Sequence, residues 1–265
     1  MAVPDLEAVV SGLALEPSAT EVVILGSALG SDHRIWDDAL PELEALFTVI
    51  RFDLPGHGVT PRAESRFTMD ELADAVIELA DRQAVHTFRF AGVSIGGALA
   101  LVLSRRYPER VVAAGVVCSA ATFGGVTSGF LERAESVRAE GMGFVTPAIP
   151  GRWFAPAFIE HEPEIVERIV DMVGSCDPEG YAQCCEALAT YDESARLGEI
   201  LVPVVVVSGE LDPGSTPQAG AVVAEGVRNG RLAVIAGASH LAVVEIPHDV
   251  MRELVLRFTG EVPIR

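Results

Sequence analysis

The stretch Gly92-Val93-Ser94-Ile95-Gly96-Gly97 places a serine between glycines, after a strand-like run at 87–91 and before a helix-like run at 98–106. A nucleophilic serine has to stand on a sharp turn at the carboxyl end of a buried strand, where bulky neighbours would clash. The flanking glycines remove the Cβ on either side of the serine, and the last glycine lets the helix pack closely. The alternative is a strand–helix turn with an incidental serine, and other segments of the chain decide between the two.

The chain of 265 residues is long enough for one large α/β domain with an insertion. Its apolar runs stay well short of the ~20 residues that span a membrane. The first basic residue is Arg34, so the beginning of the chain lacks the charged region of a secretory signal. We therefore expect a cytoplasmic protein that does not enter a membrane.

The net charge is −19, and all 19 basic residues are arginine. Without lysine the chain cannot form a lysine Schiff base, which excludes pyridoxal-phosphate and class I aldolase chemistry. An acidic surface also disfavours nucleic-acid binding, because that requires basic patches against phosphate. We interpret the excess of acidic over basic residues mainly as a contribution to solubility.

The four cysteines predict buried thiols and no metal site, because none pairs with a histidine at metal-ligand spacing (Cys118, Cys176, Cys184 and Cys185). We expect no metal and no organic cofactor. The sequence leaves the oligomeric state open.

Apolar runs that predict buried strands alternate with runs that predict helices. The strands are expected at 22–25, 47–52, 87–91, 111–118, 204–208 and 231–235, and the helices near 37–46, 69–81, 98–106, 218–227 and 248–259. This alternation predicts an α/β fold with a mostly parallel central sheet and helices on both faces. The runs Leu6–Val10 and Leu13–Leu15 predict one short hairpin before the sheet.

The alternation breaks between residues 122 and 196, where the pattern is helical, interrupted by Gly and Pro, and rich in aromatic residues. We interpret 1–121 and 197–265 as the sheet-containing core and 122–196 as an inserted helical lid. Such an insertion is a usual place for substrate selection.

A serine nucleophile needs a base that is oriented by an acid. Asp212 follows the predicted strand at 204–208, and His240 follows the one at 231–235. Carboxyl ends of parallel strands share one edge of the sheet, so both side chains are expected beside Ser94. The three residues together predict a Ser-His-Asp triad.

Two other acids compete with Asp212. Glu210 lies two residues earlier, and geometry alone does not reject it. Glu245 follows His240 too closely to be its partner, and we expect it to cap the last helix. We favour Asp212 because it is the only aspartate that closely follows a predicted strand between Ser94 and His240.

Acyl transfer also needs hydrogen-bond donors for the developing oxyanion. The backbone N–H of Ile95 stands at the head of the helix after Ser94, where the helix dipole helps. We assign the second donor to Leu29, in the glycine-flanked loop at 26–30. The alternative for that loop is a flexible strand–helix turn. His57, in the segment DLPGHG, is expected to hold a turn.

With these segments the chain resembles the α/β-hydrolase superfamily over essentially its whole length. It also resembles 3-oxoadipate enol-lactonases in GSALGSDHRIWD, VIRFDLPGHG, VSGELDPGSTP, GASHLAVVE and, most specifically, in the lid segments RWFAPAF and PEGYAQCCEAL. It departs from the usual Asn-Ser-Leu-Gly at Ser27-Ala28-Leu29-Gly30, from an arginine at Pro55, and from Cys-Asn-Thr-Ala at 118–121. These positions border the pocket, so they affect the substrate and leave the fold and triad unchanged.

The resemblance implies a small-molecule substrate, an enol-lactone that carries a carboxylate, with Ser27, Arg152 and Trp153 bordering it. Arg152 would bind the carboxylate, or it is a surface arginine that pairs with one of the many acids. One alternative function is a general carboxylesterase or another lactonase on the same triad. Another is a protein of hydrolase fold that captures a small lactone without turnover. Halide or epoxide chemistry through an aspartate nucleophile is disfavoured, since Ser94 occupies that position.

Overall fold

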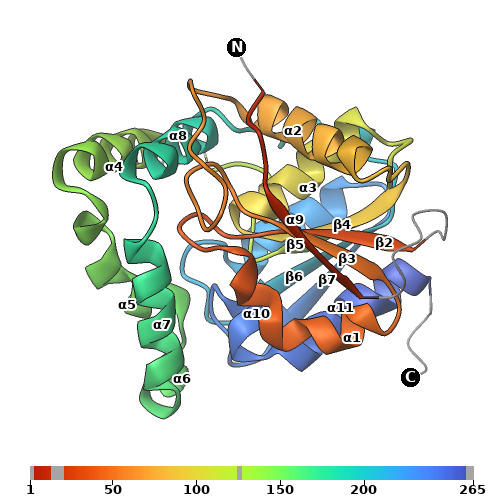
Figure 1. The fold of residues 1–265 in the computed structure, drawn as a ribbon. Coiled ribbons are helices and arrows are strands. Elements are labelled where there is room, and N and C mark those ends of the chain that lie inside the picture. The colour runs from red at the N-terminus through yellow and green to blue at the C-terminus, as the bar shows by residue number, and fades with distance from the viewer. Residues whose placement is uncertain (1–2, 13–20, 124–126, 261–265) are drawn as a thin grey trace.

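The computed structural model describes residues 3–12, 21–123 and 127–260 (Figure 1). Within this part, the strands form one seven-stranded sheet in the order β1-β3-β2-β4-β5-β6-β7. Its strands are β1 (Ala8–Gly12), β2 (Val22–Gly26), β3 (Thr48–Phe52), β4 (Phe88–Val93), β5 (Val111–Val117), β6 (Val204–Gly209) and β7 (Gly230–Ile235). All neighbouring pairs are parallel except β1 with β3. The predicted fold class, α/β with a mostly parallel sheet, is confirmed.

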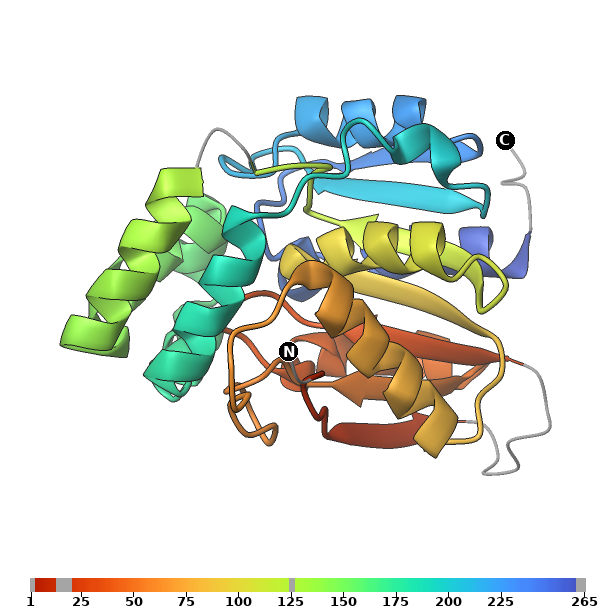
Figure 2. The same cartoon turned by 90° about the horizontal axis from the view of Figure 1, so that it is seen from above.

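Helices cover both faces of the sheet (Figures 1 and 2). One layer contains α2 (Met69–Arg82), α3 (Ile95–Arg106) and α9 (Pro217–Gly226), and the other contains α1 (Leu40–Glu44), α10 (Ala242–Glu245) and α11 (Pro247–Thr259). Because helices cover both faces, β2 and β6 are buried along their whole length, which explains their unbroken apolar sequences. None of the described helices has the length and apolarity needed to cross a membrane.

The helix expected at 37–46 is shorter than predicted and is preceded by a different element. Residues His33–Ala39 form a 3-10 helix, η1, whose N-cap Asp32 accepts a hydrogen bond from the Arg34 N–H. The α-helix begins only at Leu40, with Pro41 in its first turn. Proline has no backbone N–H to donate, so it starts a new helix more readily than it continues one.

The amino-terminal prediction also needs correction. Ala8–Gly12 is an edge strand of the main sheet, paired with β3 from Ala8 opposite Phe52 to Gly12 opposite Thr48. This strand is therefore part of the main sheet and not of a separate hairpin before it. Its pairing covers the edge of β3, which would otherwise be unpaired. The second predicted run, Leu13–Leu15, lies outside the described residues.

In the sequence, a group of helices follows β5 and precedes β6. In the structure, these helices gather at one end of the sheet (Figure 1). We call this group, residues 127–189, the helical insertion. It comprises α4 (Thr127–Glu140), η3 (Met142–Phe144), η4 (Thr146–Ala148), α5 (Ile149–Trp153), α6 (Pro156–His161), α7 (Pro163–Gly174) and α8 (Pro178–Ala189). Each of the helices α5 to α8 has a proline in its first turn, which explains why the sequence reads as many short helices.

Candidate active site

Ser94 stands between β4 and α3 in a strained conformation. Its φ of 57° and ψ of −113° lie where side-chain-bearing residues are rare, a feature that concentrates at functional sites. The turn is held from β5 and the loop after it. Ser94 N–H donates to the Val117 carbonyl over 2.9 Å, and Ser119 Oγ donates to the Ser94 carbonyl over 2.7 Å.

The three glycines around Ser94 are required by close backbone packing. A Cβ on Gly92 would overlap the backbone of Gly96. A Cβ on Gly96 would lie 2.8 Å from the Gly26 carbonyl oxygen, and one on Gly97 would lie 2.6 Å from the Ser119 Cβ. The head of α3 therefore packs directly against the loop that follows β2.

His240 is paired with Asp212. Its Nδ1 lies 2.8 Å from Asp212 Oδ2, and the Asp212 side chain is fully buried. The other oxygen, Oδ1, accepts from the N–H groups of Gly214 and Ser215 over 2.8 and 2.9 Å. Burial favours the protonated carboxyl, but the hydrogen bond and charge of His240 and the two N–H groups outweigh it. Together they hold the pKa of Asp212 below its ordinary value. With Nδ1 facing the carboxylate, Nε2 of a neutral His240 can accept a proton.

Glu210, the rival acid, is exposed and directed elsewhere. Its Oε2 accepts a hydrogen bond from the Gly237 N–H over 2.8 Å. Of the two candidates, only Asp212 contacts the imidazole of His240 in the described structure. In an extended segment, either Glu210 or Asp212 could have faced His240. The hydrogen bonds from the Gly214 and Ser215 N–H groups hold the Asp212 carboxylate in the orientation that faces the imidazole.

The two predicted oxyanion donors lie in neighbouring segments. In the loop after β2, Ala28 N–H donates to Ser31 Oγ over 3.0 Å and Gly30 N–H donates to His57 Nε2 over 2.9 Å. By contrast, neither the Leu29 nor the Ile95 N–H has an acceptor among the described residues. Buried N–H groups are rarely left unpaired in folded proteins, so these two are available to a ligand oxygen.

His57 joins the loop after β2 to the loop after β3. Because its Nε2 accepts from the Gly30 N–H, its Nδ1 carries the proton and donates to the Pro55 carbonyl over 2.9 Å. Burial lowers the pKa of His57, in keeping with a neutral ring. The ring also stacks on Tyr181 of α8, with centroids 6.1 Å apart. His57 therefore holds the turn, as expected, and it also connects this loop to the loop after β2 and to α8.

The helical insertion reaches the candidate site through Trp153. Its ring centroid lies 6.4 Å from that of His240, and its carbonyl accepts from the Leu241 N–H over 3.0 Å. Trp153 and Tyr181 both pack against Gly30. Ser27 is fully buried, and its hydroxyl has no hydrogen-bond partner in the described structure.

Three arginines of the insertion, Arg133, Arg152 and Arg168, have no acidic partner among the described residues, and the first two lie near each other. Arg152, a predicted substrate-binding residue, is exposed; partial burial of its guanidinium and repulsion from Arg133 lower its pKa. Arg133 on α4 lies 5.1 Å above the Phe130 ring and interacts with the Tyr181 hydroxyl. Sequence reasoning missed Arg133, because nothing in the pattern of α4 distinguishes it from a surface arginine.

The expectation that Glu245 caps the last helix is wrong. Helix α11 has Ile246 at its N-cap and no side-chain cap. The carboxylate of Glu245 instead accepts from the Ala155 N–H over 2.7 Å and from the Ser239 N–H over 2.6 Å. The side chain lies between two buried backbone donors, one in the helical insertion and one in the loop before His240, and sequence spacing does not reveal either contact.

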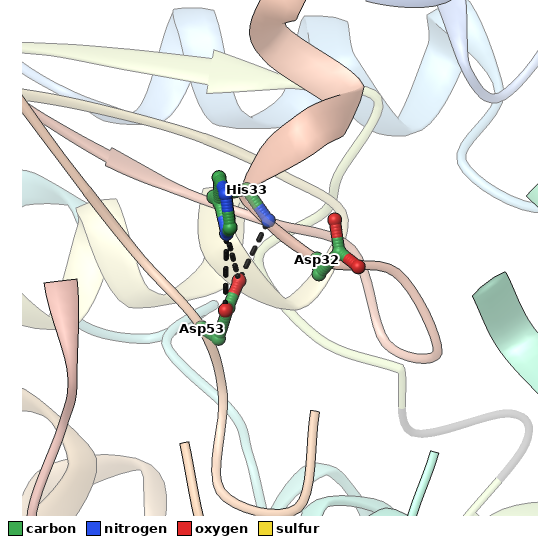
Figure 3. Close-up of side chains that lie close together, drawn as sticks. All are labelled: Asp32, His33 and Asp53. Atoms are coloured by element: carbon green, nitrogen blue, oxygen red, sulfur yellow. Dashed lines mark hydrogen bonds and ion pairs between the residues drawn. The ribbon is translucent and has the colours of Figure 1, made fainter. Parts of the chain in front are cut away.

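One group in the described residues has the composition of a metal site, namely Asp32, His33 and Asp53 (Figure 3). Asp53 accepts from the His33 N–H over 2.6 Å and the Val59 N–H over 3.0 Å, and both of its oxygens face His33 Nδ1. Asp32 is paired with Arg34 over 2.6 Å. N–H donors therefore already occupy these carboxylates, and the group serves to join η1 to the loop after β3. All four cysteines are buried and free, as predicted.

Comparison with known proteins agrees with this geometry. The model of the alpha/beta hydrolase family matches residues 22–254. The 3-oxoadipate enol-lactonase 2 of Acinetobacter baylyi is 34% identical over 225 residues, covering 85% of this chain and 84% of the relative. A pimeloyl-[acyl-carrier protein] methyl ester esterase of Neisseria meningitidis is 30% identical over 234 residues, covering 84% of this chain and 88% of the relative. The crystal structure of the enol-lactonase from Burkholderia xenovorans superimposes with a TM-score of 0.90 at 28% identity, covering 97% of this chain and 96% of that one. The chain therefore belongs to the alpha/beta hydrolase family and is a hydrolytic enzyme.

Proposed function

We propose that this hydrolase opens a small enol-lactone carrying a carboxylate, of the 3-oxoadipate enol-lactone type, through an acyl-enzyme on Ser94. The observation that carries the hydrolytic part is the buried Asp212–His240 pair at the same edge of the parallel sheet as the strained turn at Ser94. The relatives named enol-lactonases support the lactone, and the arginines Arg133 and Arg152 support the carboxylate. A cytoplasmic location stays a prediction.

In the first half of the reaction, Ser94 Oγ attacks the lactone carbonyl while His240 Nε2 takes its proton. Asp212 stays ionised and stabilises the resulting imidazolium through Nδ1. The oxyanion of the tetrahedral intermediate accepts from the N–H groups of Leu29 and Ile95. Cleavage of the ring C–O bond then leaves an acyl-enzyme, and the expelled enolate, which stays part of the acyl group, takes the proton from His240 and becomes a ketone, so that His240 is neutral again.

In the second half, His240 takes a proton from water, and the resulting hydroxide attacks the acyl carbonyl. Collapse of the second intermediate breaks the ester bond to Ser94, whose oxygen recovers a proton from His240. The product is an open-chain keto acid with one more carboxylate than the lactone. Every step is assigned to side chains and backbone groups of this chain.

We assign substrate selection to a lid formed by residues 122–196, which contain the helical insertion. Trp153 would form the wall beside His240, with Ser27 opposite it in the loop after β2. Arg133 and Arg152 differ from the other unpaired arginine of the insertion, Arg168, because they repel each other and both interact with Tyr181. A substrate carboxylate near Arg133 and Arg152 would relieve their mutual repulsion and complete their hydrogen bonding. The overall charge of −19 is screened by salt beyond ~8 Å, so the local charge decides.

A second candidate is a general carboxylesterase or another lactonase on the same triad. It is favoured by the methyl ester esterase relative at 30% identity and by the departures at Ser27 and residues 118–121. Capture of a lactone without turnover is disfavoured, because the buried Asp212–His240 pair would then have no use.

The test compares 3-oxoadipate enol-lactone, followed by its loss of ultraviolet absorbance, with neutral p-nitrophenyl esters. We expect Arg152→Ala and Arg133→Ala each to lower kcat/KM on the lactone by about 10- to 100-fold, the value of a charge-assisted hydrogen bond. Neutral esters should be affected less than threefold or so. Arg168→Ala is the matched control, since this exposed arginine of α7 also has no ion pair in the described structure. Faster turnover of neutral esters together with no effect of either arginine would favour the general esterase.

A further inference from the structure

Glu245 connects two segments that are distant in sequence. One oxygen of its carboxylate accepts from the N–H of Ala155, in the helical insertion, over 2.7 Å. The other accepts from the N–H of Ser239, the residue before His240, over 2.6 Å. Ala155 and Ser239 are both buried, at 4% and 2% exposure, so water cannot replace either bond at low cost.

A second connection runs beside the first. The N–H of Leu241, the residue after His240, donates to the carbonyl of Trp153 over 3.0 Å. Thus the N–H groups before and after His240 are held by Glu245 and Trp153 respectively. The Trp153 ring, 6.4 Å from the imidazole, lies in the same segment as Ala155. The loop carrying His240 and residues 153–155 are therefore joined on both sides of the imidazole.

We propose that Glu245 is a positioning residue that couples the placement of the helical insertion to the alignment of His240. The inference rests on the proposed role of His240 as the base, and it is independent of which ester or lactone is the substrate. The ionised carboxylate suits this task because it has two acceptor oxygens and no donor. Burial, with the nearby charge of Asp212, raises the pKa of Glu245, while its two N–H partners and His240 oppose that rise.

Glu245→Gln is the most informative substitution, since it keeps the size of the side chain. The amide has one acceptor oxygen, so its NH₂ group must face one of the two N–H donors in either orientation. The variant therefore loses one bond and gains a repulsive contact without opening a cavity.

Glu210→Gln is the matched control. Glu210 also accepts a backbone N–H bond, from Gly237 over 2.8 Å, in the same loop as His240. None of its described contacts reaches the insertion. Glu210→Gln removes the same charge near His240 but keeps the single acceptor that Gly237 needs, so an effect of charge alone would appear in both variants, whereas the loss of the bond between the insertion and the loop would appear only in Glu245→Gln.

The first measurement is kcat for p-nitrophenyl acetate, normalised to active sites by the initial burst. We expect Glu245→Gln to lower kcat about 10-fold or more with a smaller change in KM, because small misplacements of a base are costly. Glu210→Gln should stay within about twofold of the wild type. Equal values for the wild type and Glu245→Gln, or equal losses in the two variants, would overturn the proposal.

The second measurement is hydrogen–deuterium exchange, which does not depend on turnover. Peptides covering 153–158 and 237–241 should both exchange faster in Glu245→Gln, and neither should do so in Glu210→Gln, whose amide oxygen can still accept from the Gly237 N–H. Unchanged exchange at 153–158 in Glu245→Gln would overturn the coupling. If the wild type hydrolyses no ester while both peptides respond, the proposed function fails and the structural coupling stands, but without a role in catalysis.

Discussion

The loops at the carboxyl ends of the strands and the helical insertion hold their functional side chains in different ways. Asp212 is buried and accepts three hydrogen bonds, from His240, Gly214 and Ser215. In contrast, Arg152 of the insertion is exposed and has no ion pair in the described structure. On the proposed function, the reaction chemistry depends on buried, hydrogen-bonded groups of the sheet loops, while substrate choice depends on exposed side chains that can change without disturbing those loops.

The largest effect that tests this comparison is expected from Asp212→Asn. The amide can present an N–H to His240 and so favour the wrong tautomer, for which a loss in kcat of about 10⁴-fold is typical. Steady-state kinetics on any accepted ester would measure it. Glu210→Gln serves as the control, because it alters the neighbouring acid that does not contact His240. A comparable loss in both would show that the assignment of the acid is wrong.

A smaller effect is expected at His57, outside the triad. His57→Phe keeps a ring against Tyr181 but removes the acceptor of the Gly30 N–H and the donor to Pro55. The loop bearing Leu29 should then shift, and loss of one oxyanion donor costs about 10²-fold in kcat. His248→Phe is a suitable control, since His248 is exposed and pairs only with Glu42 in the described structure. An unchanged kcat in His57→Phe would remove the loop from the proposed oxyanion site.

The smallest effect concerns pH and stability. The folded state lowers the pKa of Asp212 below its ordinary 3.8, so the ionised carboxylate stabilises the fold above that value. This contribution is lost as the pH falls through the lower, folded-state pKa. The pKa of Glu245 is raised, so its ionisation opposes folding and the sign is reversed.

Both pH dependences can be measured as free energies of unfolding in denaturant, at about pH 7 and about pH 3. The free-energy difference between the wild type and Asp212→Asn should shrink toward the lower pH. For Glu245, ionisation destabilises the folded state at the higher pH. The part of the free-energy difference between the wild type and Glu245→Gln that comes from ionisation should therefore shift in favour of the wild type as the pH falls. A parallel pH dependence in the two variants would contradict the assigned environments.

The sequence predicted the sheet and the serine turn well for a physical reason. The strands before Ser94 and Asp212 are mostly buried and apolar, and even the edge strand β7 before His240 contains the short apolar run 232–235, so the ends of these runs locate the three residues without any knowledge of long-range contacts. The same kind of local signal predicted α2 nearly to the residue, and the structure shows that Thr68 and Glu71 form a capping box at its start.

The remaining features depend on contacts between segments that lie far apart in the sequence. Glu245 was assigned to the helix that follows it, whereas its partners are Ala155, in the insertion, and Ser239. Arg133 became notable only when the structure placed it beside Tyr181 without an acid. The pairing of β1 with β3 likewise follows from an open sheet edge and not from the strand's own pattern.

The central claim is that Ser94 is an activated nucleophile on a rigid turn, and covalent labelling tests it most directly. A fluorophosphonate probe followed by mass spectrometry of the intact protein and of its peptides should show one adduct, on Ser94. Ser94→Ala should show none, and Asp212→Asn should label far more slowly than the wild type. A folded wild-type protein that resists the probe, or a Ser94→Ala variant labelled as fast as the wild type, would contradict the account.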